Sequence, residues 1–224
     1  MRSAIDIARR DLAAMFMTPT GWVVLGAWGL IASLVFSLMT LLEGEPATLR
    51  AVIVVAGWSA AILAPAISMR AFAEEGRLGT MELLLSSPIS ATSLVVGKVA
   101  ACVGMLVVLG LPVLVLAGVA ELYGRVDPGE LLSGLLGLLL IGTAMASLGV
   151  LVSSRTTSQV VAYLVTFFAC FALVLVVKGV PGLLPQVLPA SANASWIETI
   201  RSVDPLLRLD SFALGLFDTA NIVW

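Results

Sequence analysis

The chain has 224 residues and a net charge of −2; 60% of its residues are hydrophobic and only 12% are charged. Soluble domains carry about 25% charged residues, so this composition and the mean hydropathy of +1.10 exclude them and predict an integral membrane protein. The chain has no basic block of the kind that predicts nucleic-acid binding. Histidine is absent, which removes the commonest general base and His-ligated metal sites. Cys102 and Cys170 lie in apolar runs without metal or redox spacing, so we expect ordinary thiols.

Residues 1–18 predict an amphipathic helix that lies at the membrane interface. Its apolar face consists of Ile5, Ala8, Leu12 and Met15. A signal peptide is the alternative, but Asp6 and Asp11 interrupt any apolar core of that kind.

Five uncharged runs are each long enough to cross a hydrocarbon core of about 30 Å. They cover residues 20–42, 51–69, 99–120, 131–152 and 160–177. Ser90, Thr92 or Ser93 is expected to cap the helix of the third span. Pro112 predicts a kink within that span, because its backbone has no donor. The chain is therefore predicted to be an all-α, polytopic helix bundle that forms one domain over residues 1–224.

The predicted fifth span is followed by a segment over residues 179–218 that we place outside the membrane. It begins with Pro181, Pro185 and Pro189 and continues into a helical stretch with a rough apolar face, expected to rest on the outer surface of the bundle. Residues 219–224 open another apolar run, which is too short to cross a membrane.

A charged segment over residues 70–88 separates the second and third spans. Burying its ionised groups in hydrocarbon costs a few kcal/mol each, so the segment lies in water or against another protein. Leu78, Met81 and Leu85 recur at helical spacing, and Pro88 ends the pattern. Its two glycines weaken a helix by about 1 kcal/mol each, so we expect an outside contact to hold it. A short charged helix of this kind is typical of a docking element, and a solvated loop is the alternative.

The stretch FAEEGRLGTMELLLSSPIS, followed by Gly97 and Lys98, resembles a motif of ABC transporter permeases of the type-2 exporter class. It is most similar to the gliding-motility and nitrous-oxide-reductase-maturation branch. A looser resemblance covers IRSVDPLLRLDSFALGLFDTANIVW, in which Asp204 replaces the usual serine of the family. The resemblance implies a sixth span that starts at residue 219, so we expect the chain to be truncated there.

The resemblance also implies that residues 70–88 form a cytoplasmic coupling helix, which binds a separate ATPase subunit. Its docking residues are expected to be Glu74, Glu75, Arg77, Leu78, Thr80, Met81 and Glu82, with the three glutamates meeting basic residues of the ATPase. Two ATPase copies, which bind the ATP and magnesium, and a second permease chain, identical or related, are the implied partners. The implied location is the bacterial inner (plasma) membrane.

The chain itself has no nucleotide chemistry, because its one Gly-Lys pair lacks the rest of a phosphate-binding loop. The spans carry no ionisable residue at mid-depth, so an external motor is needed for transport. We therefore expect no enzyme activity and no cofactor in this chain alone. Three interpretations remain: an ATP-driven exporter permease, a module of the same build that moves a periplasmic partner without passing solute, and a membrane scaffold without a motor.

Two stripes of small residues allow close helix packing. They are Gly26, Gly29, Ser33 and Ser37 in the first span, and Gly142, Ala146, Gly149 and Ser153 in the fourth. For both stripes, packing within one bundle is favoured over contact between two chains. If two chains do pair, the stripe of the first span is the candidate for their contact. Positive charges are somewhat more frequent on the side of the N-terminus, which places that terminus in the cytoplasm.

Overall fold

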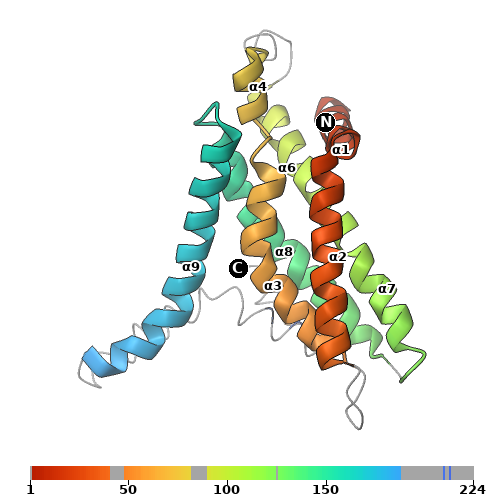
Figure 1. Cartoon of the computed structure of the whole chain (residues 1–224). Helices are drawn as coiled ribbons and strands as arrows, with labels where there is room; N and C mark the ends of the chain where they lie inside the picture. The colour runs from red at the N-terminus through yellow and green to blue at the C-terminus, as the bar shows by residue number, and fades with distance from the viewer. Residues whose placement is uncertain are drawn as a thin grey trace.

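A computed structural model describes residues 2–40, 48–81, 90–124, 126–187, 209 and 212. Within these ranges the regular elements are all helices, and five of them are long and apolar enough to cross a membrane, as the sequence predicts. The helices are α1 (Arg2–Met17), α2 (Pro19–Met39), α3 (Arg50–Ser68), α4 (Ala73–Leu78), α6 (Ala91–Leu109), α7 (Leu111–Ala120), α8 (Pro128–Ser153) and α9 (Gln159–Val187). Figure 1 shows α1, α4 and the turn between α8 and α9 at one end of the bundle, here called the α4 end.

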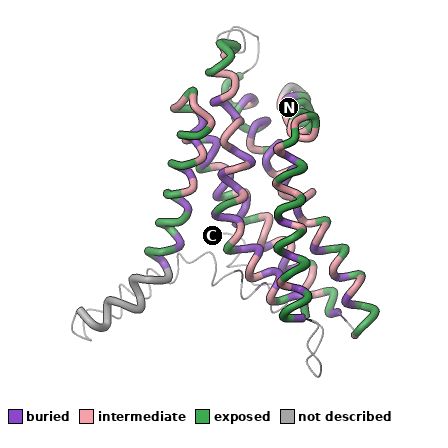
Figure 2. Tube along the Cα trace, in the orientation of Figure 1, coloured by how far each residue is buried: buried purple, intermediate pink, exposed green. Residues whose placement is uncertain are grey.

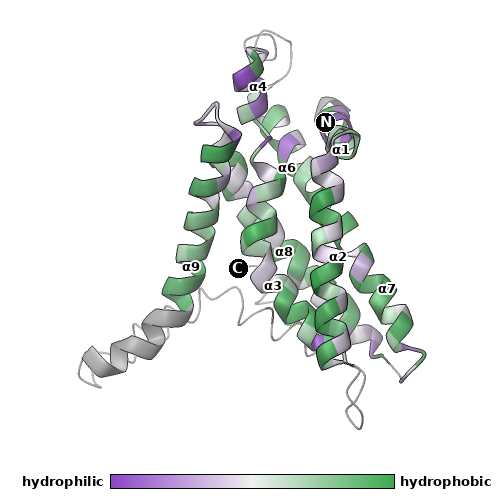
Figure 3. Ribbon diagram, in the orientation of Figure 1, coloured by the Kyte–Doolittle hydropathy of each residue, from purple (hydrophilic) through white to green (hydrophobic). Residues whose placement is uncertain are grey.

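Hydrophilic residues gather at the α4 end, while the long helices are coloured mainly as hydrophobic (Figure 3). This distribution matches the requirement that the spans face hydrocarbon and the charged segment does not. The predicted spans agree with α2, α3 and α8 within a few residues. The link between the first two predicted spans (residues 43–47) and the predicted start of a sixth span (219–224) lie outside the described residues.

Helix α6 begins at Ala91, as a cap at Ser90 predicts, eight residues before the uncharged run that starts at residue 99. Ser90 is the N-cap, and its Oγ accepts a hydrogen bond from the backbone N–H of Ser93 at 3.2 Å. A helix start at Ala91 places Lys98 inside α6, where its side chain is only 4% exposed.

The predicted interruption at Pro112 separates α6, which ends at Leu109, from α7. Proline has no N–H to donate, so a carbonyl group near it loses its helical partner. The indole Nε1 of Trp28, a buried residue of α2, donates to the carbonyl of Leu109 at 2.9 Å. A side chain of a neighbouring span thus supplies a hydrogen bond to a backbone carbonyl at the helix break, which lipid tails could not supply.

The last membrane span, Gln159–Val177, agrees with the prediction, but its helix runs beyond the span. Helix α9 continues to Val187 and contains Pro181 and Pro185, which we expected in an irregular external segment. Membrane helices tolerate internal prolines better than soluble ones do. Of the helical stretch predicted farther along, Leu209 and Phe212 are described, and both are buried against Gly137 of α8.

Small residues of α8 are buried inside the bundle, and Figure 2 shows buried residues gathered toward its centre. A Cβ added at Gly142 would lie 2.9 Å from the side chain of Leu106, and one added at Gly149 would overlap Ser68 Oγ. Ala146 is fully buried between them. These three residues serve helix packing within one chain.

The small residues of α2 face outward instead. Gly26, Ser33 and Ser37 are exposed, and a Cβ at Gly26 would meet nothing within 4 Å. Gly29 lines a shallow groove beside Pro112 of α7. The stripe of α2 therefore makes little contact within the described part of the chain.

Candidate functional site: the α4 end

Helix α4 is shorter than the sequence pattern indicates. It ends at Leu78, because Gly79 adopts a left-handed conformation with φ of 70°. The backbone N–H of Thr80 then donates to the carbonyl of Glu75 at 3.0 Å, which closes the helix with a glycine C-cap. Leu78 and Met81 thus do not share one helix face, contrary to our expectation. Glu82 and Leu85 lie outside the described residues.

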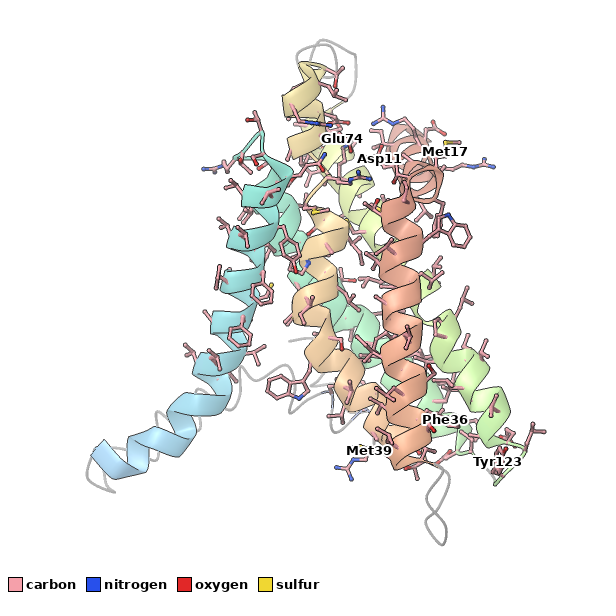
Figure 4. All side chains as sticks on the ribbon, in the orientation of Figure 1. Asp11, Met17, Phe36, Met39, Glu74 and Tyr123 are labelled. Carbon is pink, nitrogen blue, oxygen red and sulfur yellow. The ribbon has the colours of Figure 1, made fainter. Side chains whose placement is uncertain are left out.

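Four charged side chains from three helices meet at the base of α4 and form an ion-pair cluster: Arg10 and Asp11 of α1, Glu75 of α4 and Lys98 of α6 (Figure 4 labels Asp11). Lys98 Nζ lies 2.6 Å from Glu75 Oε1 and 2.8 Å from Asp11 Oδ2, and 5.4 Å from the ring centroid of Phe72. A buried ammonium is costly unless it is paired, so two carboxylates and an aromatic face satisfy it together.

Arg10 completes the cluster from its more exposed side. Its guanidinium lies 2.9 Å from the carboxylate of Asp11 and 3.2 Å from that of Glu75, so the four charges balance. Partial burial acts to lower the pKa of Arg10, but its two carboxylate partners outweigh this and raise the pKa above its usual value. The cluster thus ties α4 to α1 and α6 with no net charge to stabilise.

Two glycines of α6 let α1 approach closely enough for these ion pairs. A Cβ at Gly97 would lie 2.8 Å from the carbonyl of Ala4, and one at Gly104 would lie 2.9 Å from the side chain of Leu12. The apolar face of α1 therefore packs on protein, with Ile7 buried, whereas Ile5, predicted on that face, is 67% exposed. Gly97 and Lys98 thus act together: the glycine admits α1 and the lysine binds it.

A second contact joins the start of the charged segment to the turn between α1 and α2. Arg70 Nη1 donates to Thr18 Oγ1 and to Thr20 Oγ1, each at 2.8 Å, and its Nε lies 3.9 Å from Glu74 Oε2. A cavity of about 200 Å³, lined by both charged and apolar side chains, lies between Arg70 and the ion-pair cluster.

Ser153, the last residue of α8, bridges the break between α3 and α4. Its Oγ accepts hydrogen bonds from the N–H groups of Phe72 at 2.9 Å and Ala73 at 3.0 Å, and it donates to the carbonyl of Met69 at 3.1 Å. All three partners are backbone groups at the end of α3 or the start of α4, where helical hydrogen bonding leaves such groups unpaired. This buried hydroxyl therefore sets the angle at which α4 leaves α3.

Replacing Ser153 by alanine is expected to lower the free energy of unfolding by about 1–3 kcal/mol, because three buried backbone groups lose their partner. Ser154→Ala is the matched control, since the exposed Ser154 donates only within its own turn, to the carbonyl of Leu151. Thermal melting of both variants in detergent measures the difference. Equal melting temperatures would show that Ser153 does not support the junction.

The predicted docking residues divide into two groups. Arg77, Leu78 and Thr80 are exposed at the tip of α4, and Glu74 is partly exposed. Glu75 binds Lys98 and Arg10 of its own chain, and its expected contact with the ATPase stays a prediction. Met81 packs against the core.

Sequence reasoning did not identify Arg10, Asp11, Lys98 or Ser153 as part of this site. The available signals were a carboxylate in an amphipathic helix and a lysine next to an apolar run, neither of which indicates a partner by itself. Within the described ranges, no three Asp, Glu or Cys side chains gather as metal ligands.

Five membrane-length helices with a charged helix anchored at one end define a multi-span helical membrane protein. The model of the ABC-2 family transporter proteins matches residues 52–210, and the chain belongs to this family. It is a permease subunit of an ABC transporter, a class that lies in the plasma membrane and works with an ABC ATPase. The match does not support the narrower resemblance to the gliding-motility and nitrous-oxide-reductase-maturation branch. No individual curated protein matches the chain.

Proposed function

We propose that the chain is an export permease and that the tip of α4 is the surface on which a separate ATPase subunit docks. One observation carries the proposal: Leu78 is 62% exposed at the tip, while the base of the same short helix is fixed by the ion-pair cluster and by Ser153. An exposed leucine near Arg77 and the partly exposed Glu74 fits an apolar pocket with a charged rim. A fixed base transmits a push on the tip to α1, α3 and α6.

Co-purification tests this proposal. The chain expressed with its ATPase is expected to yield a stable complex, with two ATPase copies binding ATP and magnesium, and with ATP turnover stimulated in lipid vesicles. Transport of a solute into the same vesicles distinguishes export from a module that drives a periplasmic partner. A permease that purifies without an ATPase contradicts both and favours a scaffold without a motor.

The orientation we propose places the α4 end in the cytoplasm, together with the N-terminus and Arg155, because of its excess of positive charge. Single cysteines at Thr80, Arg155 and Tyr123 test it in a background without Cys102 and Cys170. All three residues are exposed, and Thr80 avoids the left-handed backbone of Gly79. In whole cells an impermeant thiol reagent is expected to label only the cysteine at Tyr123, and labelling at Thr80 instead would reverse the orientation.

We further propose that two permease chains pair through the exposed face of α2. Gly26→Leu adds a side chain where the described chain offers open space, so the protomer is expected to fold while a partner helix is kept away. Association in bilayers, measured by energy transfer between labelled chains, is expected to weaken about tenfold. Gly118→Leu on α7, which is equally open, is the control. Equal effects of both changes would place the seam elsewhere.

A further inference from the structure

An apolar cavity lies beside the interruption between α6 and α7. Its volume is about 160 Å³, and its walls come from α2, α3, α6, α7 and α8. Trp28, Ala56, Ala60, Leu106, Leu138 and Gly142 are among the lining residues. An apolar cavity of about 150 Å³ in a protein interior stays dry and binds a benzene-sized group.

The walls offer an occupant almost nothing but hydrocarbon. The carbonyl of Leu109, a polar group that the interruption brings to this region, already accepts the hydrogen bond of Trp28 Nε1. No charged side chain lines the cavity. A ligand with its own polar groups would leave them unpaired there, at a cost that an aliphatic chain does not incur.

The mouth of the cavity identifies the source of the occupant. Val107 and Leu114 are 53% and 45% exposed, and both lie within the span that runs from Ala91 to Ala120. The surroundings at this depth are lipid tails. We propose that the cavity binds an acyl chain of a bilayer lipid, which enters between these two side chains and fills the space beside Trp28.

This proposal is independent of the ATPase, so it stands or falls separately from the export function. It also gives the helix interruption a role, because the end of α6 and the start of α7 line the cavity that the acyl chain fills. Irregular backbone at membrane depth is tolerated where it is buried in protein or lines a cavity.

Trp28 provides the measurement, because it lines the cavity and is only 2% exposed. Replacing Trp22, Trp58, Trp196 and Trp224 by phenylalanine leaves it as the sole tryptophan of the full chain. Bilayers of phosphatidylcholine with bromine atoms at mid-chain are expected to quench its fluorescence, since bromine quenches only at short range. The same lipid without bromine gives the reference intensity.

Ala60→Leu is expected to reduce this quenching about twofold or more, because the added atoms occupy a space that holds only a benzene-sized group. Ala56→Leu, from the same wall, is a second filling variant, and thermal melting shows which of them remains folded. Ala27→Leu, the same change at an exposed position of α2, is expected to leave the quenching unchanged. The proposal is overturned if the brominated lipid does not quench Trp28, or if it quenches the filling variants as strongly as the protein with the original alanines. It is also overturned if a second copy of the protein covers the mouth of the cavity.

Discussion

Lys98→Met is expected to lower the free energy of unfolding by about 3 kcal/mol, at the lower end of the cost of removing one partner from a buried ion pair. The change leaves the carboxylates of Asp11 and Glu75 close together without the cation they share. Arg10 still pairs with both, which is why we expect the lower end. Thermal or denaturant unfolding in detergent measures the loss.

The control neutralises three charges of the cluster together and leaves only Arg10, whose side chain is 55% exposed. In the triple variant Lys98→Met, Asp11→Asn and Glu75→Gln no buried carboxylate is left, and most of the stability should return, because a buried ion pair can often be replaced by neutral groups at little cost. A single Lys98→Met variant as stable as the wild type would show that the cluster does not hold α4.

The same geometry changes what a charge reversal at Glu75 would test. Glu75→Lys would bring a third cation against Lys98 and Arg10, so it is expected to loosen α4 from its base. Loss of ATPase binding in that variant would therefore not prove a direct contact. A test of docking has to change the tip of α4 and leave the cluster intact.

Leu78→Asp is the second change with a large expected effect. A carboxylate placed in an apolar docking pocket costs at least about 2 kcal/mol, which corresponds to a roughly 30-fold loss of affinity for the ATPase. The spans should remain folded, because the side chain of Leu78 is exposed and is not part of the core in the described chain. Co-purification and stimulated ATP turnover in vesicles measure the result.

Leu122→Asp is the matched control for that experiment. Leu122 is 82% exposed in the turn after α7, at the end of the bundle opposite to α4. The same substitution there is expected to leave both ATPase binding and turnover at wild-type levels. If Leu78→Asp also leaves them unchanged, the ATPase docks on another surface.

The sequence by itself determined the class of fold and the approximate spans. Uncharged runs of 18 residues or more have no stable place outside a bilayer, so the five membrane-length helices follow from hydropathy alone. The interruption at Pro112 also follows locally, because a proline removes a backbone donor wherever it stands. The charges of residues 70–81 likewise predict from the sequence alone that this segment lies outside the hydrocarbon.

Only the tertiary structure decided what the charges of that segment do. Arg10 and Glu75 are 65 residues apart, and Glu75 and Lys98 are 23 apart, so no helical or strand spacing relates them. Their meeting depends on α1 lying against α6 at Gly97, a contact set by the packing of two helices. Ser153 likewise reaches the start of α4 only because α8 ends beside it. Local periodicity therefore indicated a charged docking helix, whereas packing determined that Glu75 anchors its base and that Leu78 remains exposed at its tip.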